Sequence, residues 1–330
     1  MLTPQILLDA MDRAQFPVPA ERERLQDLDA ARDFQAAVNA LRLDRGDRAM
    51  GFKIGFTNRS LWPLYNVFNP IWAPVWDRTV YQSDAKPSVQ IVDIDMNAIG
   101  KPLSAFLLPR LEPEIVLGLR HAPASSSLED VADSVEWVAH GFEIVQCVYP
   151  EWSFTAAESF AAQSLHAALL IGPRRKVLQH RQLATFLSAV RLNMTCNGNV
   201  IADGDGTAVL DGPIQAFAHL VGMLADQPPL AEPLQLRAGS IITTGTLTDA
   251  QPLLHWLGDF LVFQSTPMRE VARELERRFD VTVRVADGAV AERTVTAWFS
   301  DESLEDILLI VCRAADATCG VRDTTVTIEP

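Results

Sequence analysis

Acidic residues within apolar runs are the first feature of this sequence with chemical meaning. Glu112 and Glu114 stand two positions apart at the start of an apolar run, and Glu143 lies in a second one. Residues two apart in a β-strand point to the same face. A lone buried carboxylate is costly unless it is paired or binds a cation, and carboxylate oxygens suit hard divalent ions. The sequence therefore predicts that the three glutamates bind one Mg²⁺ or Mn²⁺.

A solvated strand face is the alternative explanation for Glu112 and Glu114, and it is the commoner situation for a Glu-x-Glu pair. The residues that follow, Ile115-Val116-Leu117, are all apolar and leave no polar face for the strand to continue. This pattern favours the buried interpretation.

Lys53 is the candidate for proton transfer. It lies in the run Gly51-Phe52-Lys53-Ile54-Gly55, where desolvation by apolar neighbours would lower the pKa of its amine and make it a base. A lysine that extends from the strand to water is the alternative. His140, His166 and His219 are candidates by residue type alone, and we assign none of them to the metal.

Composition places the chain among soluble globular proteins. Its 330 residues are 48% hydrophobic and 21% charged, which is enough for a sizeable core and two domains. A net charge of −14 argues against nucleic-acid or membrane partners, which need a basic surface. No apolar run reaches membrane-spanning length. Asp9 and Asp12 interrupt the N-terminus, so no secretory signal is expected.

The cysteines form no C-x-x-C pair, which argues against a zinc site or a disulfide framework. We therefore expect reduced thiols in a cytoplasmic protein. The cysteines are Cys147, Cys196, Cys312 and Cys319.

Hydrophobic periodicity predicts an α+β protein. Residues 4–45 have helical spacing, divided by Pro17 and Pro19 into two helices. From Gly51 onward, short β-rich segments bounded by Gly, Pro and Asn indicate a mixed, mostly antiparallel sheet. The turn signal Asn197-Gly198-Asn199 predicts a hairpin. The expected strands are 51–55, 79–81, 114–119, 141–148, 167–171, 190–196 and 240–244, with helices near 154–165 and 212–225.

The segment after Trp256 predicts a small domain of its own. Its signals follow the order βαββαβ over about seventy residues, the size of a small independent domain. Thr266 and Pro267 mark the start of its first helix, and Ser303 marks that of its second. The predicted divisions are an N-terminal helical region at 1–50, a catalytic domain at 51–257 and an accessory α/β domain at 258–330.

Six segments resemble, in order, the 2-keto-4-pentenoate hydratase and oxalocrotonate decarboxylase family within the fumarylacetoacetate hydrolase superfamily. The resemblance covers roughly residues 5–253. The segments are GFKIGFT at 51–57, PRLEPE at 109–114, HGFEIV at 140–145, SLHAALLIG at 164–172, GDGTAVLDGP at 204–213 and TTGTLTDA at 243–250.

This resemblance implies a β-roll fold and a set of site residues. It assigns Glu112, Glu114 and Glu143 to the metal, and it makes Lys53 and Asp77 a proton-handling pair. By the same resemblance, the substrate-binding residues are Thr246, Gly245 and Leu111.

From about Gly258 the chain is similar to a different family, the C-terminal domain of iron-citrate-type anti-sigma sensor proteins. That domain is itself similar to the short N-terminal domain of secretins and TonB-dependent receptors. The segments that carry the resemblance are FQSTPMREV at 263–271 and FSDESLEDIL at 299–308. Such modules bind other proteins, so the resemblance implies a protein partner for this part of the chain.

The resemblance over the first 253 residues implies a metal-dependent hydratase of aromatic-compound catabolism, which adds water to a 2-hydroxy-2,4-dienoate or 2-oxo-enoate. A decarboxylase of 4-oxalocrotonate type and an acylpyruvate hydrolase are alternatives within the same fold. The non-enzymatic alternative is a protein-binding module attached to an inert enzyme body. The resemblance also implies a homo-oligomer, because the last strands usual in the family are absent and a sheet edge would need cover.

Overall fold

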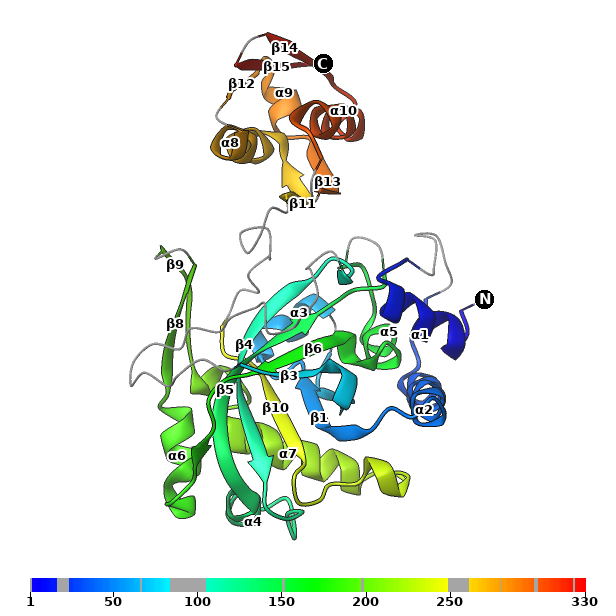
Figure 1. Cartoon of the computed structure of the whole chain (residues 1–330), viewed down its shortest axis with the longest axis vertical. Helices are drawn as coiled ribbons and strands as arrows, with labels where there is room; N and C mark the ends of the chain where they lie inside the picture. Colours follow the sequence, from blue (N-terminus) through cyan, green and yellow to red (C-terminus); the bar gives the residue numbers. More distant parts are fainter. Residues whose placement is uncertain are drawn as a thin grey trace. The chain divides into compact units, whose positions relative to one another are not determined.

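The contacts in the computed structural model divide the chain into two compact units, Met1–Pro252 and Leu253–Pro330 (Figure 1). Each unit is described by itself. The expected boundary near residue 257 lies outside the described residues, as do Pro17 and Pro19. The structure describes residues 2–16, 24–65, 67–83, 105–149, 152–196, 199–248, 261–279, 281–299, 302–322 and 324–330.

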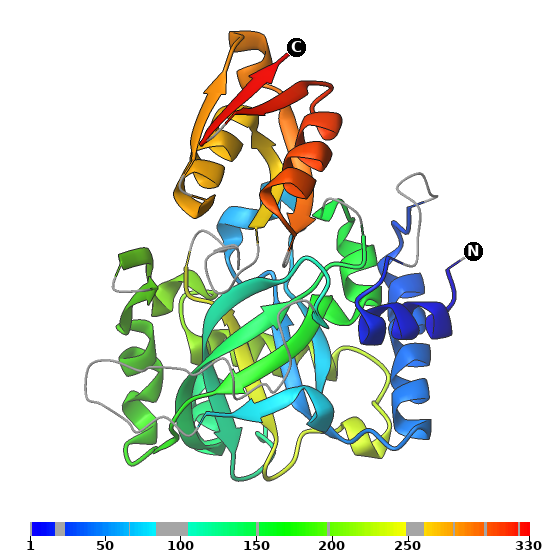
Figure 2. The ribbon, with the colours of Figure 1, turned by 45° about the horizontal axis from the view of Figure 1, so that its top comes forward.

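Unit 1 is built on a curled eight-stranded sheet in the order β2-β1-β10-β4-β5-β6-β3, with β7 paired to β5 (Figure 2). The β1–β10 and β3–β6 pairs are parallel, and the other pairs are antiparallel. The sheet is therefore mixed and mostly antiparallel, as the sequence predicts. Its strands are β1 (Ala49–Gly55), β2 (Ile71–Trp76), β3 (Val80–Gln82), β4 (Arg110–Leu119), β5 (Val135–Val145), β6 (His166–Ile171), β7 (Arg175–Lys176) and β10 (Ile241–Thr246).

Helices cover this sheet, and their ends follow ordinary capping rules. Thr3 caps α1 by accepting a hydrogen bond from the amide of Ile6, and Thr155 with Glu158 forms a capping box on α5. Helix α7 packs on β1 and β10, and both α4 and α6 pack on α7. The helices of unit 1 are α1 (Pro4–Arg13), α2 (Leu28–Asp44), α3 (Trp62–Tyr65), α4 (Leu128–Ser134), α5 (Ala156–Ala161), α6 (Leu183–Ser188) and α7 (Pro213–Ala225).

The segment Gly206–Ala225, which contains α7, is long and apolar enough to cross a membrane by length and composition, contrary to the sequence expectation. Its apolar character has a different explanation in the fold. The side chains of Ile214, Ala216, Phe217 and Leu220 are fully buried in the core of unit 1. The segment therefore supplies core residues, and its apolar stripe faces the sheet.

Two prolines lie inside strands of the sheet, and each one interrupts the residue pattern that is typical of a β-strand. Pro74 lies in β2, which is an edge strand and can accept a residue without an N–H group. This proline hid β2 from the sequence analysis. Pro113 lies in the central strand β4, where the pairing with β10 is interrupted between Thr243 and Thr246. The interruption is a β-bulge, and it redirects the amide of Gly245.

The predicted hairpin is formed by β8 (Arg191–Cys196) and β9 (Asn199–Asp205), which pair antiparallel. The residues between them, Asn197 and Gly198, lie outside the described residues.

Unit 2 has its own two sheets and its own core. Strand β11 (Leu261–Pro267) pairs with β13 (Thr294–Phe299), and the second sheet has the order β12-β15-β14. Helix α9 and strand β14 were not expected from the sequence, and Pro267 ends β11 instead of starting the helix. The remaining elements are α8 (Met268–Phe279), β12 (Thr282–Val285), α9 (Gly288–Ala291), α10 (Leu304–Ala314), β14 (Thr318–Arg322) and β15 (Thr325–Glu329).

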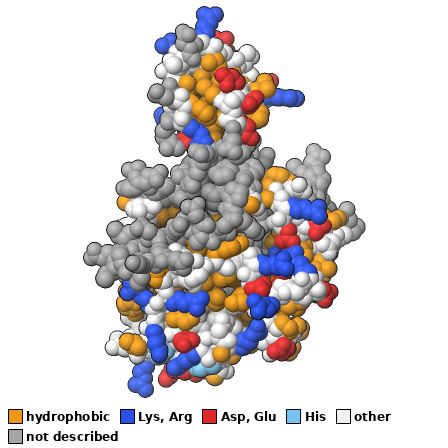
Figure 3. Space-filling model, viewed as in Figure 1, with side chains coloured by type: hydrophobic (Ala, Val, Ile, Leu, Met, Phe, Trp, Pro, Cys, Tyr) orange, Lys and Arg blue, Asp and Glu red, His pale blue; other side chains and the backbone are white. Residues whose placement is uncertain are grey.

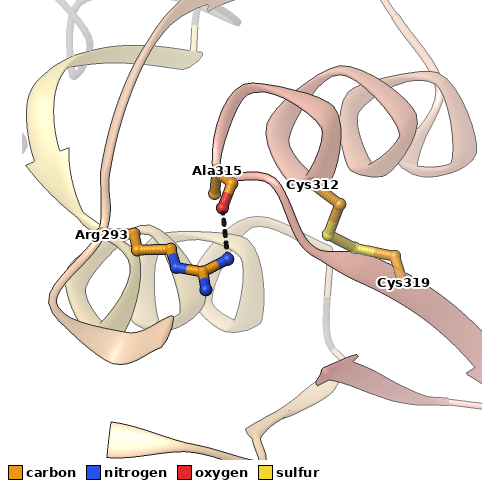
Figure 4. The surroundings of a disulfide bond; sticks show 4 residues. All are labelled: Arg293, Cys312, Ala315 and Cys319. Atoms are coloured by element: carbon orange, nitrogen blue, oxygen red, sulfur yellow. Dashed lines mark hydrogen bonds between the residues drawn. A yellow bond between two sulfur atoms is a disulfide. The ribbon is translucent and has the colours of Figure 1, made fainter. Parts of the chain in front are cut away.

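A disulfide joins Cys312 at the end of α10 to Cys319 in β14 (Figure 4). The expectation of four reduced cysteines is wrong for this pair. The turn between them also accepts a hydrogen bond at the carbonyl of Ala315, donated by Arg293 Nη1 over 3.0 Å. The sequence missed the pair because β14, which brings Cys319 back beside α10, was not predicted.

Charged side chains of both signs are interspersed over unit 1 in the face shown in Figure 3. Several of them form surface ion pairs, such as Arg120 with Asp133 and Arg59 with Asp211.

We expect unit 1 to fold without unit 2, because the core of unit 2 shares no residue with the cores of unit 1. A chain that ends at Pro252 should keep its circular dichroism spectrum, and its Tm should change by less than about 4 °C. The isolated segment 253–330 serves as the matched control and should unfold in its own cooperative transition. Collapse of the shortened chain into aggregates would contradict this division.

Candidate functional site

The three predicted glutamates meet on one face of the central strands. In the β4–β5 pair, Glu112 lies opposite Glu143, and Glu114 lies opposite Gly141. All three side chains are buried, and one carboxylate oxygen from each lies within 4.8 Å of those of the other two. The antiparallel register brings together acids that are about thirty positions apart in the sequence, as the spacing within β4 and β5 requires.

The two carboxylate oxygens of Glu114 differ in their hydrogen bonding. Its Oε2 accepts hydrogen bonds from Thr243 Oγ1 and, over 2.7 Å, from the amide of Gly245. Its Oε1 is buried and has no hydrogen-bond partner among the described residues. Burial, followed by the charges of Glu143 and Glu112, raises the pKa of Glu114 well above its usual value.

Glu143 is held by two side chains on its two oxygens. Lys53 Nζ lies 3.0 Å from Oε2, and His166 Nδ1 lies 2.6 Å from Oε1. Burial alone would raise the pKa of Glu143, but the charge of Lys53 and the hydrogen bond from His166 outweigh it and lower the pKa. The other ring nitrogen of His166 lies 2.9 Å from Thr79 Oγ1. This contact fixes the plane of the imidazole ring.

Lys53 is buried rather than extended to water, with 3% of its surface exposed. Its amine also donates a hydrogen bond of 3.0 Å to the carbonyl of Ser164. Burial would lower the pKa of Lys53, but the charges of Glu143, Glu112 and Glu114 outweigh burial and raise it. The expectation that the pKa of Lys53 is lowered is therefore wrong. It was based on the apolar neighbours in the sequence and did not include the three glutamates.

Lys53 and Glu112 line a cavity of about 60 Å³ whose wall has both polar and apolar side chains. The polar side chains that line it are Lys53, Thr57, Asn58, Glu112, Ser159, Ser164 and Thr246. The apolar side chains that line it are Ile54, Phe56, Ile71, Val145, Trp152, Phe154 and Leu165, and Gly55 and Gly245 complete the wall.

The other predicted site residues divide into two groups. Gly245 and Thr246 line the cavity at the bulge of β10. Leu111 is buried on β4 directly before Glu112 and is not among the lining residues.

Asp77 is not brought to Lys53. It accepts hydrogen bonds of 3.0 Å from the amide and from Nε of Arg48. These bonds and the charge of Arg48 lower the pKa of Asp77, although burial acts in the opposite direction. Arg48 precedes Lys53 by five residues along the β1 segment, which corresponds to roughly 16 Å.

The sequence analysis missed the strained segment that carries the Lys53 contact. Gln163, Ser164 and Leu165 have consecutive φ values of 56°, 49° and 63°. Such left-handed backbone is costly for residues other than glycine and concentrates at functional sites. Ser164 Oγ is buried at the cavity without a hydrogen-bond partner among the described residues. A serine followed by leucine carries no sequence signal for this conformation.

The donor set fits a hard divalent cation. Three carboxylates supply oxygen ligands only, and Glu114 Oε1 is buried without a hydrogen-bond partner among the described residues. Mg²⁺ and Mn²⁺ prefer such ligands and accept water or substrate oxygens at their remaining positions. Glu112, Glu114 and Glu143 could therefore hold such an ion, with the adjoining cavity open to a small ligand.

Comparison with known proteins confirms the resemblance inferred from the sequence. The chain is 28% identical to a 2-hydroxyhexa-2,4-dienoate hydratase of Comamonas testosteroni over 224 residues, which are 66% of this chain and 76% of that protein. It is also 28% identical to a 4-oxalocrotonate decarboxylase of a Pseudomonas species over 225 residues, 68% of this chain and 78% of that protein.

The fold and the C-terminal segment have relatives of their own. The 4-oxalocrotonate decarboxylase of Pseudomonas putida G7, solved with magnesium and adipate, covers 77% of this chain and 91% of its own with a TM-score of 0.59. At 23% identity, this structural match shows the shared fold alone. Residues 260–328 match the family model described as FecR, C-terminal.

We expect Mg²⁺ to stabilise the protein through the glutamate cluster. At about 100 times the dissociation constant, binding contributes about 2.7 kcal/mol, and Tm should rise on the order of 5 °C or more. The Glu114→Gln variant should lose this rise, yet it should be at least as stable as the wild type without metal because one repelling charge is removed. Differential scanning fluorimetry with and without MgCl₂ measures both effects.

The exposed Glu136 on the same pair of strands provides the control. Glu136→Gln should respond to Mg²⁺ as the wild type does. An equal rise in Tm for Glu114→Gln would place the ion elsewhere.

Proposed function

We propose that this chain is a metal-dependent hydratase that adds water to a 2-hydroxy-2,4-dienoate during the catabolism of aromatic compounds. The observation that carries the proposal is the cavity shared by Lys53 and Glu112, with Glu114 and Glu143 directly behind. The relatives described above act on substrates of this class by name. A bound divalent ion would supply Lewis-acid polarisation of the C2 oxygen and the carboxylate of such a substrate.

The reaction needs a group that moves protons at the distal carbons. Addition of a proton at C5 of 2-hydroxypenta-2,4-dienoate and loss of the enol proton give 2-oxopent-3-enoate. Water then adds its hydroxyl at C4 and a proton at C3, which yields 4-hydroxy-2-oxopentanoate. Lys53 is the only cationic side chain among the described residues that line the cavity. We assign both proton transfers at carbon to its amine, which donates a proton to C5, takes one from the attacking water, donates that one to C3, and is restored by the proton that the enol releases.

The remaining polar groups of the cavity would position the substrate. Gly245 and Thr246 lie beside the glutamates on β10, and the hydroxyl of Thr246 lies 3.1 Å from that of Thr248. We assign the substrate carboxylate to this loop. The strained turn at Ser164 would fix the amine of Lys53 through its carbonyl and place its own hydroxyl toward the cavity.

Decarboxylation of a 4-oxalocrotonate-type acid is the second candidate function. The hydratase and decarboxylase relatives have the same identity to this chain, so sequence similarity does not separate them. The glutamates and Lys53 would serve both reactions, because both pass through an enolate at C2. Detection of a hydroxylated oxo acid or of CO₂ decides between them.

The hydrolase alternative requires a His–Glu pair that activates water. The structure contains such a pair in His166 and Glu143. However, Thr79 occupies the second nitrogen of His166, and His166 is not among the residues that line the cavity. This pair therefore holds a proposed metal ligand in place and does not face a substrate.

We also propose a cytoplasmic homo-oligomer whose C-terminal unit binds a protein partner. The catabolic relatives and the FecR-like segment support these assignments. Although disulfides are uncommon in a reducing compartment, the Cys312–Cys319 bond of the structure should be present in protein purified without a reductant. Counting of thiols under denaturing conditions measures this.

The wild-type protein should consume 2-hydroxypenta-2,4-dienoate only when Mg²⁺ or Mn²⁺ is present. Loss of the conjugated chromophore in the ultraviolet follows the reaction, and mass spectrometry of the product identifies hydration. EDTA should abolish turnover, and an excess of MgCl₂ should restore it. A folded, metal-loaded protein without activity on any dienoate would support the inert-body alternative instead.

Lys53→Met should lower kcat by about 10²–10⁴-fold, because the isosteric side chain fills the space but moves no proton. Lys176→Met, at an exposed lysine, is the matched control and should retain wild-type kinetics. Asp77→Asn should change kcat/KM by less than about tenfold. If Asp77→Asn loses as much activity as Lys53→Met, the result would support the proton-handling pair of Lys53 and Asp77 that the family resemblance implies.

A further inference from the structure

Trp152 lines the cavity together with Val145, Phe154 and Leu165, which belong to one hydrophobic cluster and are called here the apolar end of the cavity. Three contacts fix the side chain of Trp152. Its indole N–H donates a hydrogen bond of 3.1 Å to the carbonyl of Leu108. The guanidinium of Arg110 lies 3.8 Å from the centre of the indole ring, within the range of a cation–π contact. The ring of Phe154 lies 6.1 Å away in a tilted arrangement. Trp152 is 7% exposed, so this wall is built into the core.

The backbone around this wall is strained in the same way as the turn at Ser164. Trp152 has a φ of 55°, and Leu108, which accepts its hydrogen bond, has a φ of 46°. A bulky residue rarely adopts this conformation, and it persists where the surrounding contacts require it. The position of the indole is therefore determined by its neighbours and does not follow from local chain preference.

Strand geometry places this wall one step beyond the glutamates along β4 and β5. Glu114, Glu112 and Arg110 occupy alternate positions of β4 and share one face. Arg110 lies opposite Val145, and Glu112 lies opposite Glu143. Arg110 and Val145 are thus one step of roughly 7 Å from the pair of glutamates. Trp152 covers Arg110 at this point.

The cation of Arg110 is therefore behind the indole ring. Trp152 lines the cavity, whereas Arg110 is not among the lining residues. Among the described lining residues, Val145, Phe154 and Leu165 belong to the same hydrophobic cluster as Trp152, and all three are apolar and buried. A carboxylate placed against such a surface would lose its hydration without gaining a partner, which is costly.

We propose that Trp152 determines substrate choice by screening Arg110, so that the cavity accepts a 2-hydroxydienoate with an uncharged, alkyl distal end and rejects one with a distal carboxylate. This inference rests on the function proposed above and specifies its substrate class. Trp152 acts on specificity, and the glutamates and Lys53 act on the reacting end. The same wall favours hydration of a monocarboxylate over decarboxylation of a dicarboxylate.

A matched pair of substrates tests the inference. 2-Hydroxyhexa-2,4-dienoate ends in a methyl group, and 2-hydroxymuconate has a carboxylate in the same place. The wild-type protein should prefer the methyl substrate by on the order of 100-fold in kcat/KM. In Trp152→Ala, which uncovers Arg110, this preference should fall by at least about tenfold. The double variant Trp152→Ala with Arg110→Met should lose the increase in kcat/KM for 2-hydroxymuconate that Trp152→Ala gains.

Inhibition by saturated analogues gives a second measurement that does not depend on turnover. The inhibition constant of 2-oxohexanoate should be lower than that of 2-oxoadipate for the wild type and for Trp152→Phe, and the difference should shrink for Trp152→Ala. Trp152→Phe retains an aromatic side chain at the wall. It is therefore the variant to measure if Trp152→Ala does not fold.

The outcomes separate this inference from the proposed function. Equal use of both substrates by an active wild type, or a preference for 2-hydroxymuconate, would overturn the inference and leave the metal-dependent chemistry intact. A selectivity that is unchanged in Trp152→Ala would also overturn it. A wild type that binds Mg²⁺ but transforms no dienoate would overturn the proposed function itself.

Discussion

Repulsion among three buried carboxylates is the constraint on which the rest of unit 1 depends. Glu112, Glu114 and Glu143 place their oxygens within 4.8 Å of one another in the protein interior. When all three are ionised, the ammonium of Lys53 leaves two negative charges uncompensated. A divalent cation balances that remainder, and hydrogen bonds stabilise the carboxylates of Glu114 and Glu143. Without a cation, the cluster therefore destabilises the folded state, and the same charges favour the binding of a divalent cation.

Several irregularities of the fold follow from this constraint. Pro113 has no N–H group, and the adjoining bulge in β10 turns the amide of Gly245 away from the strand ladder toward Glu114. A side chain at Gly245 would collide with Thr57, and its φ of 99° also favours glycine. The left-handed turn at Ser164 persists because its carbonyl binds Lys53, which is itself held by Glu143. Local strain is thus stabilised through the charges that the site requires.

Sequence reasoning reached the parts of the structure that depend on periodicity and on residue type. The alternation of Glu112 and Glu114 indicated a strand face, and the buried Lys53 was identified by its apolar neighbours. Three features depended on tertiary contacts and could not be read locally. The raised pKa of Lys53 depends on acids more than fifty positions away, and the partnership of His166 with Thr79 depends on the parallel pairing of β3 and β6. Strand β2 was obscured by Pro74, which is tolerated only because that strand lies at an edge.

The two ends of the cavity carry different kinds of information about function. The glutamates and Lys53 lie in the segments that resemble the hydratase and decarboxylase family, and their chemistry suits both reactions. Trp152 and Phe154 lie outside those segments, in the part of the chain after β5. Similarity in the shared segments therefore indicates the chemistry at the reacting end of the substrate and does not indicate which group stands at the distal end. Because Trp152 stands between the cavity and Arg110, the proposed substrate choice depends on a side chain that lies in none of the six segments that carry the resemblance.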